Sequence, residues 1–187
     1  MNCGTFSGNP KTEWLCGGGN DRAMRLLADF WYIDPAGRRW LAPEGSVIDG
    51  ASIPQTLWSS VGSPYTGEYR RASIVHDVAC DTPHGVRTDG DTMFYFACLC
   101  GGCSPLQAKL LYAGVRIGSW VSEQPVLTLE LAPDAAPGER LPGQQTENEL
   151  AVRARFTLLS GELRASGDDF DDIRAIVDRH LAAATPP

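Results

Sequence analysis

The sequence predicts an α+β fold in which an N-terminal β-hairpin or small antiparallel sheet packs on a helical bundle, followed by a C-terminal helical extension. Strand-forming residues flank a turn within 26–42, and apolar residues recur at helical spacing within 68–120. Proline and glycine then interrupt the pattern. The expected parts are an N-terminal loop segment at 1–25, a core domain at 26–120, a linker or wrapping arm at 121–146 and an acidic helical extension at 147–187.

The hairpin is predicted from two stretches rich in strand formers. Residues 26–33 read L-L-A-D-F-W-Y-I, the D-P-A-G that follows is typical of a turn, and 38–42 form the returning strand. Residues 46–48 predict a short further strand that ends just before Asp49 and Gly50. The candidate core residues of the hairpin are Trp31, Ile33 and Trp40.

Helices are predicted for most of the remaining chain. Thr88 followed by Asp91 resembles a capping box, and Ser104 before Pro105 is a typical helix start. The aspartates at 168–172 complement the dipole of the last helix. The expected helical ranges are 55–61, 68–80, 88–100, a segment from 105 to about 120, 147–163 and 168–183.

Composition excludes several classes of protein. With 43% hydrophobic residues the chain can bury a core, and a net charge of −7 argues against binding nucleic acid. No apolar run is long enough for a transmembrane segment. The N-terminus lacks the pattern of a signal peptide. We therefore expect synthesis in the cytoplasm, with any export through dedicated secretion or phage-type machinery.

Six cysteines leave two interpretations open. They are buried thiols or disulfides, or three of them bind structural zinc. The zinc interpretation rests on the C-x-C-x-x-C spacing of Cys98, Cys100 and Cys103.

The strongest candidate for chemistry is a histidine and an aspartate on neighbouring predicted helices. His76 lies about one turn before the end of its helix, and Asp91 lies about one turn after the start of the next. If the two helices pack antiparallel across a short loop, the side chains can meet. A carboxylate on one ring nitrogen orients the imidazole and leaves the other nitrogen as a general base.

Acidic residues near His76 suggest a metal. Asp49 and Asp77 offer hard oxygen ligands for calcium, with backbone carbonyls around Gly50. Further candidates are Ser52 as a nucleophile, Cys80 on the His76 face of the helix, and Arg87 and Asp89. In the alternative interpretation His76 is a buried structural residue, and Asp77 forms an ion pair with Arg70, Arg71 or Arg87. His84 and His180 are expected to be solvated.

Several stretches resemble, in order, a family of phages, prophages and proteobacteria that is known only as a domain of unknown function. They cover about residues 26–120, and the resemblance implies no established activity. The stretches are L-L-A-D-F-W-Y-I-D-P-A-G-R-R-W, D-G-A-S-I-P, Y-R-R-A-S-I-V-H-D-V-A-C, M-F-Y-F-A and A-K-L-L-Y-A-G-V-R-I-G-S-W.

The order D-G-x-S, then H-D, then D-x-x-F is also similar to the active site of small bacterial calcium-dependent secreted phospholipases. This resemblance implies that His76 activates water, that Asp77 and the Asp49-Gly50 loop bind calcium, and that Asp91 orients the histidine. The sequence departs from that family in having Ala79 and Cys80 where a tyrosine often follows, and in the hairpin before Asp49.

These observations lead to one functional hypothesis and two alternatives. The chain is expected to be a small hydrolase with a His76–Asp91 dyad, acting on a lipid ester or another cell-envelope substrate, as a delivered effector, toxin or phage-derived product. One alternative is a non-enzymatic phage-derived assembly module. The other is a peptidoglycan hydrolase with zinc at His76, Asp49 and Asp77. An immunity or delivery protein is a possible partner of the acidic C-terminal helices.

Overall fold

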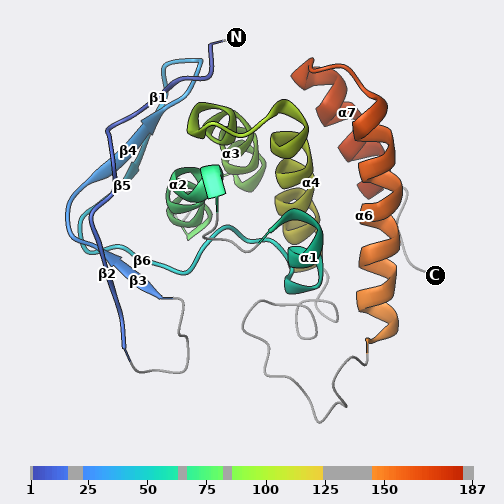
Figure 1. Cartoon of the computed structure of the whole chain (residues 1–187), viewed down its shortest axis with the longest axis horizontal. Coiled ribbons are helices and arrows are strands. Elements are labelled where there is room, and N and C mark those ends of the chain that lie inside the picture. The colour runs from blue at the N-terminus through green and yellow to red at the C-terminus, as the bar shows by residue number, and fades with distance from the viewer. Residues whose placement is uncertain (1, 17–22, 63–66, 82–85, 124–144, 183–187) are drawn as a thin grey trace. The chain divides into compact units, whose positions relative to one another are not determined.

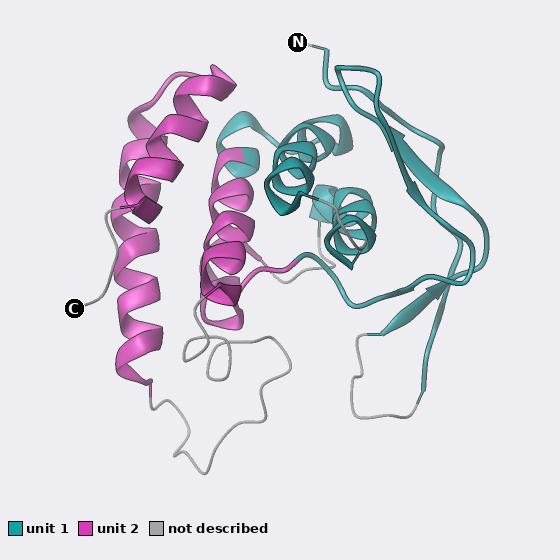
Figure 2. Cartoon of the chain, turned by 180° about the vertical axis from the view of Figure 1, so that it is seen from behind, with its two compact units in different colours: residues 1–51, 64–108 teal, residues 52–63, 109–187 magenta. Residues whose placement is uncertain are grey.

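The computed structural model describes residues 2–16, 23–62, 67–81, 86–123 and 145–182. The chain forms two compact units, coloured separately in Figure 2. The first comprises Met1–Ala51 and Pro64–Ala108, and the second comprises Ser52–Ser63 and Lys109–Pro187. The α+β class expected from the sequence is confirmed, because small antiparallel sheets and several helices are both present.

Two small antiparallel sheets belong to the first unit. One has the strand order β1 (Thr5–Phe6), β4 (Phe30–Ile33) and β5 (Arg39–Ala42). The other has the order β2 (Thr12–Trp14), β3 (Met24–Leu26) and β6 (Val47–Ile48). The predicted hairpin is confirmed by the pairing of β4 with β5. Its turn is held by the Asp34 carboxylate, which accepts hydrogen bonds from the amides of Ala36 and Arg38.

The sequence interpretation was wrong in making 26–33 a single strand. Leu26 ends β3 in one sheet, and Phe30 begins β4 in the other. The break is fixed by hydrogen bonds, because the Asp29 carboxylate accepts from the amide of Glu44 instead of continuing a ladder. Residues 1–25, expected to be a loop, also supply β1 and β2.

Strand β4 buries the opposite face from the predicted one. Phe30 and Tyr32 are buried, and the Tyr32 hydroxyl donates to the carbonyl of Cys3. Successive side chains of a strand point to opposite faces, so Trp31 and Ile33 lie on the outer face. Trp40 pairs with Tyr32 and shares its face, where the guanidinium of Arg38 covers the Trp40 ring, 3.9 Å from the ring centroid. The residues wrongly predicted to be core, and in fact half-buried, are Trp31, Ile33 and Trp40.

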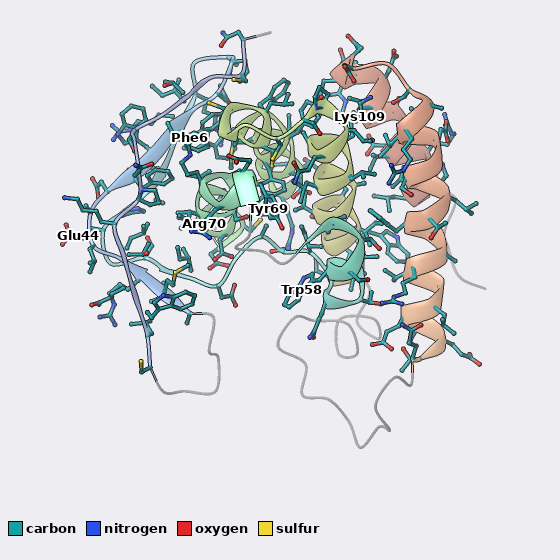
Figure 3. The ribbon with its side chains drawn as sticks, viewed as in Figure 1. Phe6, Glu44, Trp58, Tyr69, Arg70 and Lys109 are labelled. Carbon is teal, nitrogen blue, oxygen red and sulfur yellow. The ribbon has the colours of Figure 1, made fainter. Side chains whose placement is uncertain are left out.

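Two helices carry the core of the first unit. The short 3₁₀ turn η2 (Gly67–Tyr69) leads into α2 (Arg70–Asp81), which packs against α3 (Arg87–Gly101). The sheet with β1, β4 and β5 lies along one side of this pair (Figure 1). Phe6, labelled in Figure 3, stacks on Phe30 within this core, and the guanidinium of Arg71 on α2 lies over its ring. The helix predicted at 68–80 is confirmed.

The start of α3 differs from the prediction. Its N-cap is Val86, without a side-chain hydrogen bond, so the capping box of Thr88 and Asp91 is wrong. Asp91 is buried and instead contacts His76. At the other end Gly102 has φ of 112°, a left-handed conformation that glycine adopts readily, and the predicted glycine stop is confirmed.

The second unit is helical. It contains η1 (Gln55–Leu57), α1 (Trp58–Val61), residues 109–122 of α4 (Pro105–Ser122), α6 (Glu147–Ala165) and α7 (Phe170–Ala182). All correspond to predicted helices, with boundaries shifted by a few residues. Most of the predicted 121–146 arm lies outside the described residues. None of the helices described is both long and apolar enough to cross a membrane.

Polar contacts tie the second unit together. Thr146 caps α6 in a capping box with Glu149. Lys109 of α4, labelled in Figure 3, is buried. Its ammonium group donates to the carbonyl of Ser166 and lies 2.7 Å from an Asp168 oxygen. Arg153 on α6 donates to both oxygens of Thr56.

Candidate functional site

The expected contact between His76 and Asp91 is present in the first unit. Nε2 of His76 lies 2.8 Å from Oδ1 of Asp91, and neither side chain has any exposed surface. The contact joins α2 to the second turn of α3, since these two helices pack along each other. The ring also packs against Phe94, with centroids 4.8 Å apart. The imidazole is therefore held in one orientation by a carboxylate and an aromatic ring.

The surroundings of His76 favour its charged form. Burial lowers the pKa of His76, but the charge of Cys80 and the hydrogen bonds to Asp91 and Cys80 together raise it to about 10. The imidazole therefore holds its proton at neutral pH. In this form it is a proton donor and a positive charge, whereas the sequence suggested a general base.

Cys80 lies one helical turn after His76 and on the same face of α2. Its Sγ is 3.5 Å from Nε2 and 3.8 Å from Nδ1 of His76. Unlike the two buried side chains it is partly exposed. Donor atoms of His76, Cys80 and Asp91 all lie within 4.8 Å of one another. Cys80 thus forms the solvent-facing side of the cluster.

Asp77 binds the backbone of the Asp49–Gly50 loop. Its Oδ2 accepts hydrogen bonds from the backbone amides of Asp49, at 2.7 Å, and Gly50, at 3.2 Å. Gly50 has φ of 111°, which disfavours any residue with a Cβ at this position. The D-G loop therefore presents N–H groups to Asp77, where carbonyl ligands for calcium were expected.

Calcium at Asp49 and Asp77 fits these residues only in part. Burial and the charge of Asp49 raise the pKa of Asp77 to about 7, although the two amides lower it. Two carboxylates held near each other suit a divalent cation. However, one oxygen of Asp77 is already engaged with the loop amides. The donor sets proposed for calcium and for zinc at His76, Asp49 and Asp77 both stay predictions.

Of the remaining candidates, Ser52 belongs to the second unit, and Arg87 and Asp89 belong to α3 in the first. Asp89 is exposed and forms an ion pair with Arg38 on the hairpin, 3.1 Å long. Arg87 is the first residue of α3 and half-buried. Among the described contacts, Asp77 forms no ion pair with Arg70, Arg71 or Arg87. Its hydrogen-bond partners are the backbone amides of Asp49 and Gly50.

The C-x-C-x-x-C cysteines do not converge on one point. Cys98 is hydrogen-bonded to Cys103, and burial raises the pKa of Cys98 well above its usual value. Cys100 instead interacts with Cys3 and donates to the carbonyl of Gly4. The described residues therefore group four of the thiols in two pairs, and do not support the alternative interpretation of a three-thiolate zinc site.

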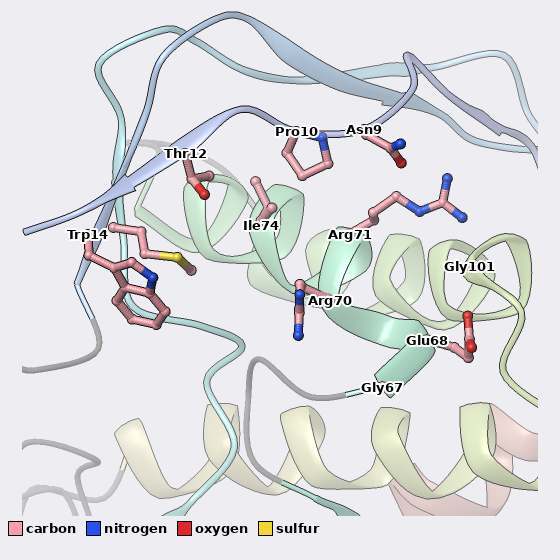
Figure 4. Close-up of a pocket in the computed structure, with 11 residues that line it drawn as sticks. Asn9, Pro10, Thr12, Trp14, Gly67, Glu68, Arg70, Arg71, Ile74 and Gly101 are labelled. Carbon is pink, nitrogen blue, oxygen red and sulfur yellow. The ribbon is translucent and has the colours of Figure 1, made fainter.

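A pocket of about 470 Å³ in the first unit was missed by sequence reasoning. Figure 4 shows Trp14, Thr12 and Pro10 of the N-terminal segment on one side and Arg70 and Ile74 of α2 on the other. Helical positions rotate by about 100° per residue, so Ile74 and His76 point to roughly opposite faces of α2. The pocket and the His76 cluster are therefore separate sites. The alternation in T-E-W was the available signal for this strand.

The chain has two further histidines, of which His84 lies outside the described residues. His180 was expected to be solvated, but it is only 21% exposed, and its Nε2 lies 2.8 Å from an oxygen of Glu162. It therefore belongs to an ion-pair cluster between α6 and α7.

Residues 24–115 match a protein family described as "Protein of unknown function (DUF1353)". Uncharacterized protein y4jT of Sinorhizobium fredii (strain NBRC 101917 / NGR234) is 38% identical over 113 residues, which are 60% of this chain and 33% of that protein. Uncharacterized protein y4iH of the same strain is 34% identical over 169 residues, 84% of this chain and 64% of that protein. The chain thus spans less than two thirds of each relative. No solved structure matches.

Proposed function

We propose that this protein is a small hydrolase whose reaction centre is His76, oriented by Asp91, with Cys80 at the solvent-facing side. The observation that carries the proposal is the fully buried contact of 2.8 Å between Nε2 and Oδ1. A charged imidazole held in a fixed direction is a common element of acid–base catalysis. The similarity to a family without known function neither adds to nor detracts from this proposal.

The contact with Asp91 determines which ring nitrogen of His76 can exchange a proton with a substrate. Asp91 binds Nε2, so Nδ1 is the atom from which a proton would move. With a pKa of about 10, His76 donates a proton to a leaving group at neutral pH and accepts one from water only in alkaline solution. Calcium at Asp49 and Asp77, if bound, would polarise the carbonyl oxygen of the substrate.

The substrate class, a lipid ester or another component of the cell envelope, rests on the order D-G-x-S, H-D and D-x-x-F. The test is hydrolysis of phospholipid vesicles, soluble esters and peptidoglycan by the wild-type chain and by His76→Gln and Asp91→Asn. We expect both variants to lose at least about 100-fold in rate while circular dichroism shows them folded. Equal activity of folded variants would refute the role of His76.

The full burial of His76 and Asp91 favours a second candidate, a non-enzymatic phage-derived assembly module. In that protein the pair would only fasten α2 to α3. It predicts a lower free energy of unfolding, by about 1–3 kcal/mol, for either variant. Function in any assay would then follow the folded fraction alone. Wild-type hydrolysis that survives purification and is lost in a folded variant would exclude this candidate.

An immunity or delivery protein is the proposed partner of the acidic extension. The exposed acidic side chains at the start of α7, Asp171 and Asp172, support binding to a basic surface. Asp172→Lys should weaken capture of such a partner in a salt-dependent manner. Capture that is unaffected by both the charge change and salt would rule out this surface.

A further inference from the structure

Two donor atoms, from Cys80 and Asp91, lie around one nitrogen of His76, which suggests a metal site with a different donor set from those expected. His76 and Cys80 are four residues apart on α2, a spacing that puts both on one helix face. Asp91 reaches them from α3. Their donor atoms, Nε2, Sγ and Oδ1, lie within 4.8 Å of one another.

The geometry differs from that of a nucleophilic triad. In a triad the nucleophile and the carboxylate bind opposite nitrogens of the imidazole. Here Oδ1 of Asp91 is 2.8 Å from Nε2, and Sγ of Cys80 is also closer to Nε2, at 3.5 Å, than to Nδ1, at 3.8 Å. This arrangement places both neighbours beside one nitrogen, where one cation can contact all three donors.

The spacing suits a tetrahedral zinc ion. With Zn–N of about 2.0 Å and Zn–S of about 2.3 Å, nitrogen and sulfur ligands lie about 3.5 Å apart. The distance from Nε2 to Sγ is 3.5 Å. Nitrogen and oxygen ligands of zinc lie about 3.3 Å apart, so Asp91 would have to move away by about half an ångström.

The kinds of donor atom in the cluster, and the burial of the residues that carry them, indicate which metal would bind. A thiolate and an imidazole favour zinc and exclude the oxygen coordination that calcium requires. His76 and Asp91 are fully buried, while Cys80 is partly exposed. Three protein ligands with an accessible side match zinc sites that keep a fourth position for water.

We infer that His76, Cys80 and Asp91 bind one Zn²⁺ per chain. This deepens the proposed function, on which its catalytic meaning rests, because zinc would supply a bound hydroxide at neutral pH. His76 would then be a ligand. Metal binding itself can be measured without any substrate.

The test uses the full chain, freed of metal with a chelator. Zn²⁺ is titrated by calorimetry, and Co²⁺ is added as a spectroscopic probe of thiolate ligation. We expect one Zn²⁺ per wild-type chain and a near-ultraviolet thiolate-to-cobalt charge-transfer band. Cys80→Ser should abolish the band and weaken Zn²⁺ binding by at least about 100-fold. Cys16→Ser, which changes an exposed thiol, is the matched control and should behave as wild type.

Cys80 is the residue of choice because it is partly exposed, so its replacement by serine should leave the fold intact, which circular dichroism would show. Absence of stoichiometric Zn²⁺ binding by folded wild-type protein would overturn the inference, as would binding unchanged in Cys80→Ser. Zinc binding without hydrolysis would support the site and refute the proposed function. Hydrolysis that persists after zinc removal would support the function and refute a catalytic role for the bound zinc.

Discussion

Replacement of Asp91 by asparagine tests the electrostatics of the buried pair in metal-free protein. Asparagine keeps the shape and a hydrogen-bond acceptor but removes the negative charge. The pKa of His76 is about 10, compared with 6.5 for an ordinary histidine, a difference equivalent to about 5 kcal/mol to which Cys80 and Asp91 both contribute. Burial lowers this pKa and the charge of Cys80, which the variant keeps, raises it, so in the variant we expect the pKa of His76 to fall below its wild-type value. We expect Asp91→Asn to lose about 2–4 kcal/mol at pH 7.

The sign of the pH dependence follows from the raised pKa. A group with a raised pKa in the folded state contributes stability that is complete below its unfolded pKa, and that is lost as pH rises through its folded pKa. Wild-type protein should therefore lose stability between about pH 6.5 and 10. The difference from Asp91→Asn should be at its full size at about pH 6.5 and just below, and should shrink towards pH 10.

The assay is urea unfolding at several pH values with chelator present, together with NMR titration of the histidine ring signals. The chain has only three histidines, so the signals can be assigned by substitution. Asp89→Asn is the matched control, because it is an exposed aspartate on the same helix and should change stability by less than about 0.5 kcal/mol. A difference that is constant with pH, or a His76 titration near 6.5, would refute the reasoning.

Three further predictions concern other buried contacts. The pKa of Asp77 is raised to about 7, so the free energy of unfolding should fall by at most about 4 kcal/mol as pH rises from 4 to 7. Asp77→Asn should flatten this fall, which urea unfolding at several pH values would measure. Gly118→Ala would bring a Cβ within 1.9 Å of the Ser52 carbonyl oxygen, and should cost about 1–3 kcal/mol or more by the same method. Lys109→Met keeps the buried stem but loses the contact with Asp168, and should lower the thermal midpoint by several degrees, equivalent to about 1–2 kcal/mol; an unchanged midpoint would contradict its structural role.

The helices and the hairpin could be predicted because their signals are local. Turn residues, caps and apolar spacing mark them within a few residues. The buried face of the hairpin could not be predicted in the same way. Phe30, Trp31, Tyr32 and Ile33 are all strand formers with apolar surface, so alternation gives no preference between the two faces. Pairing with β1 and packing on α2, which are long-range contacts, decide it.

The site shows the same division. The contact of His76 with Asp91 was predictable from the positions of two residues near a short connection. The hydrogen bonds of Asp77 were not predictable, because its partners are backbone amides, which every residue except proline has. The position of Cys80 at one turn from His76 was visible in the sequence, but its approach to the nitrogen that Asp91 binds depends on the packing of α3.

The contribution of β1 and β2 to the sheets has a practical consequence for fragments. The family match begins at residue 24, after both strands. A fragment cut at that boundary would uncover the β4 backbone opposite Thr5 and Phe6, and the β3 backbone opposite 12–14. Unpaired edges of this kind are templates for intermolecular strand addition. Expression of the matched segment alone should therefore yield aggregates, and N-terminal fusions should be joined well before residue 5.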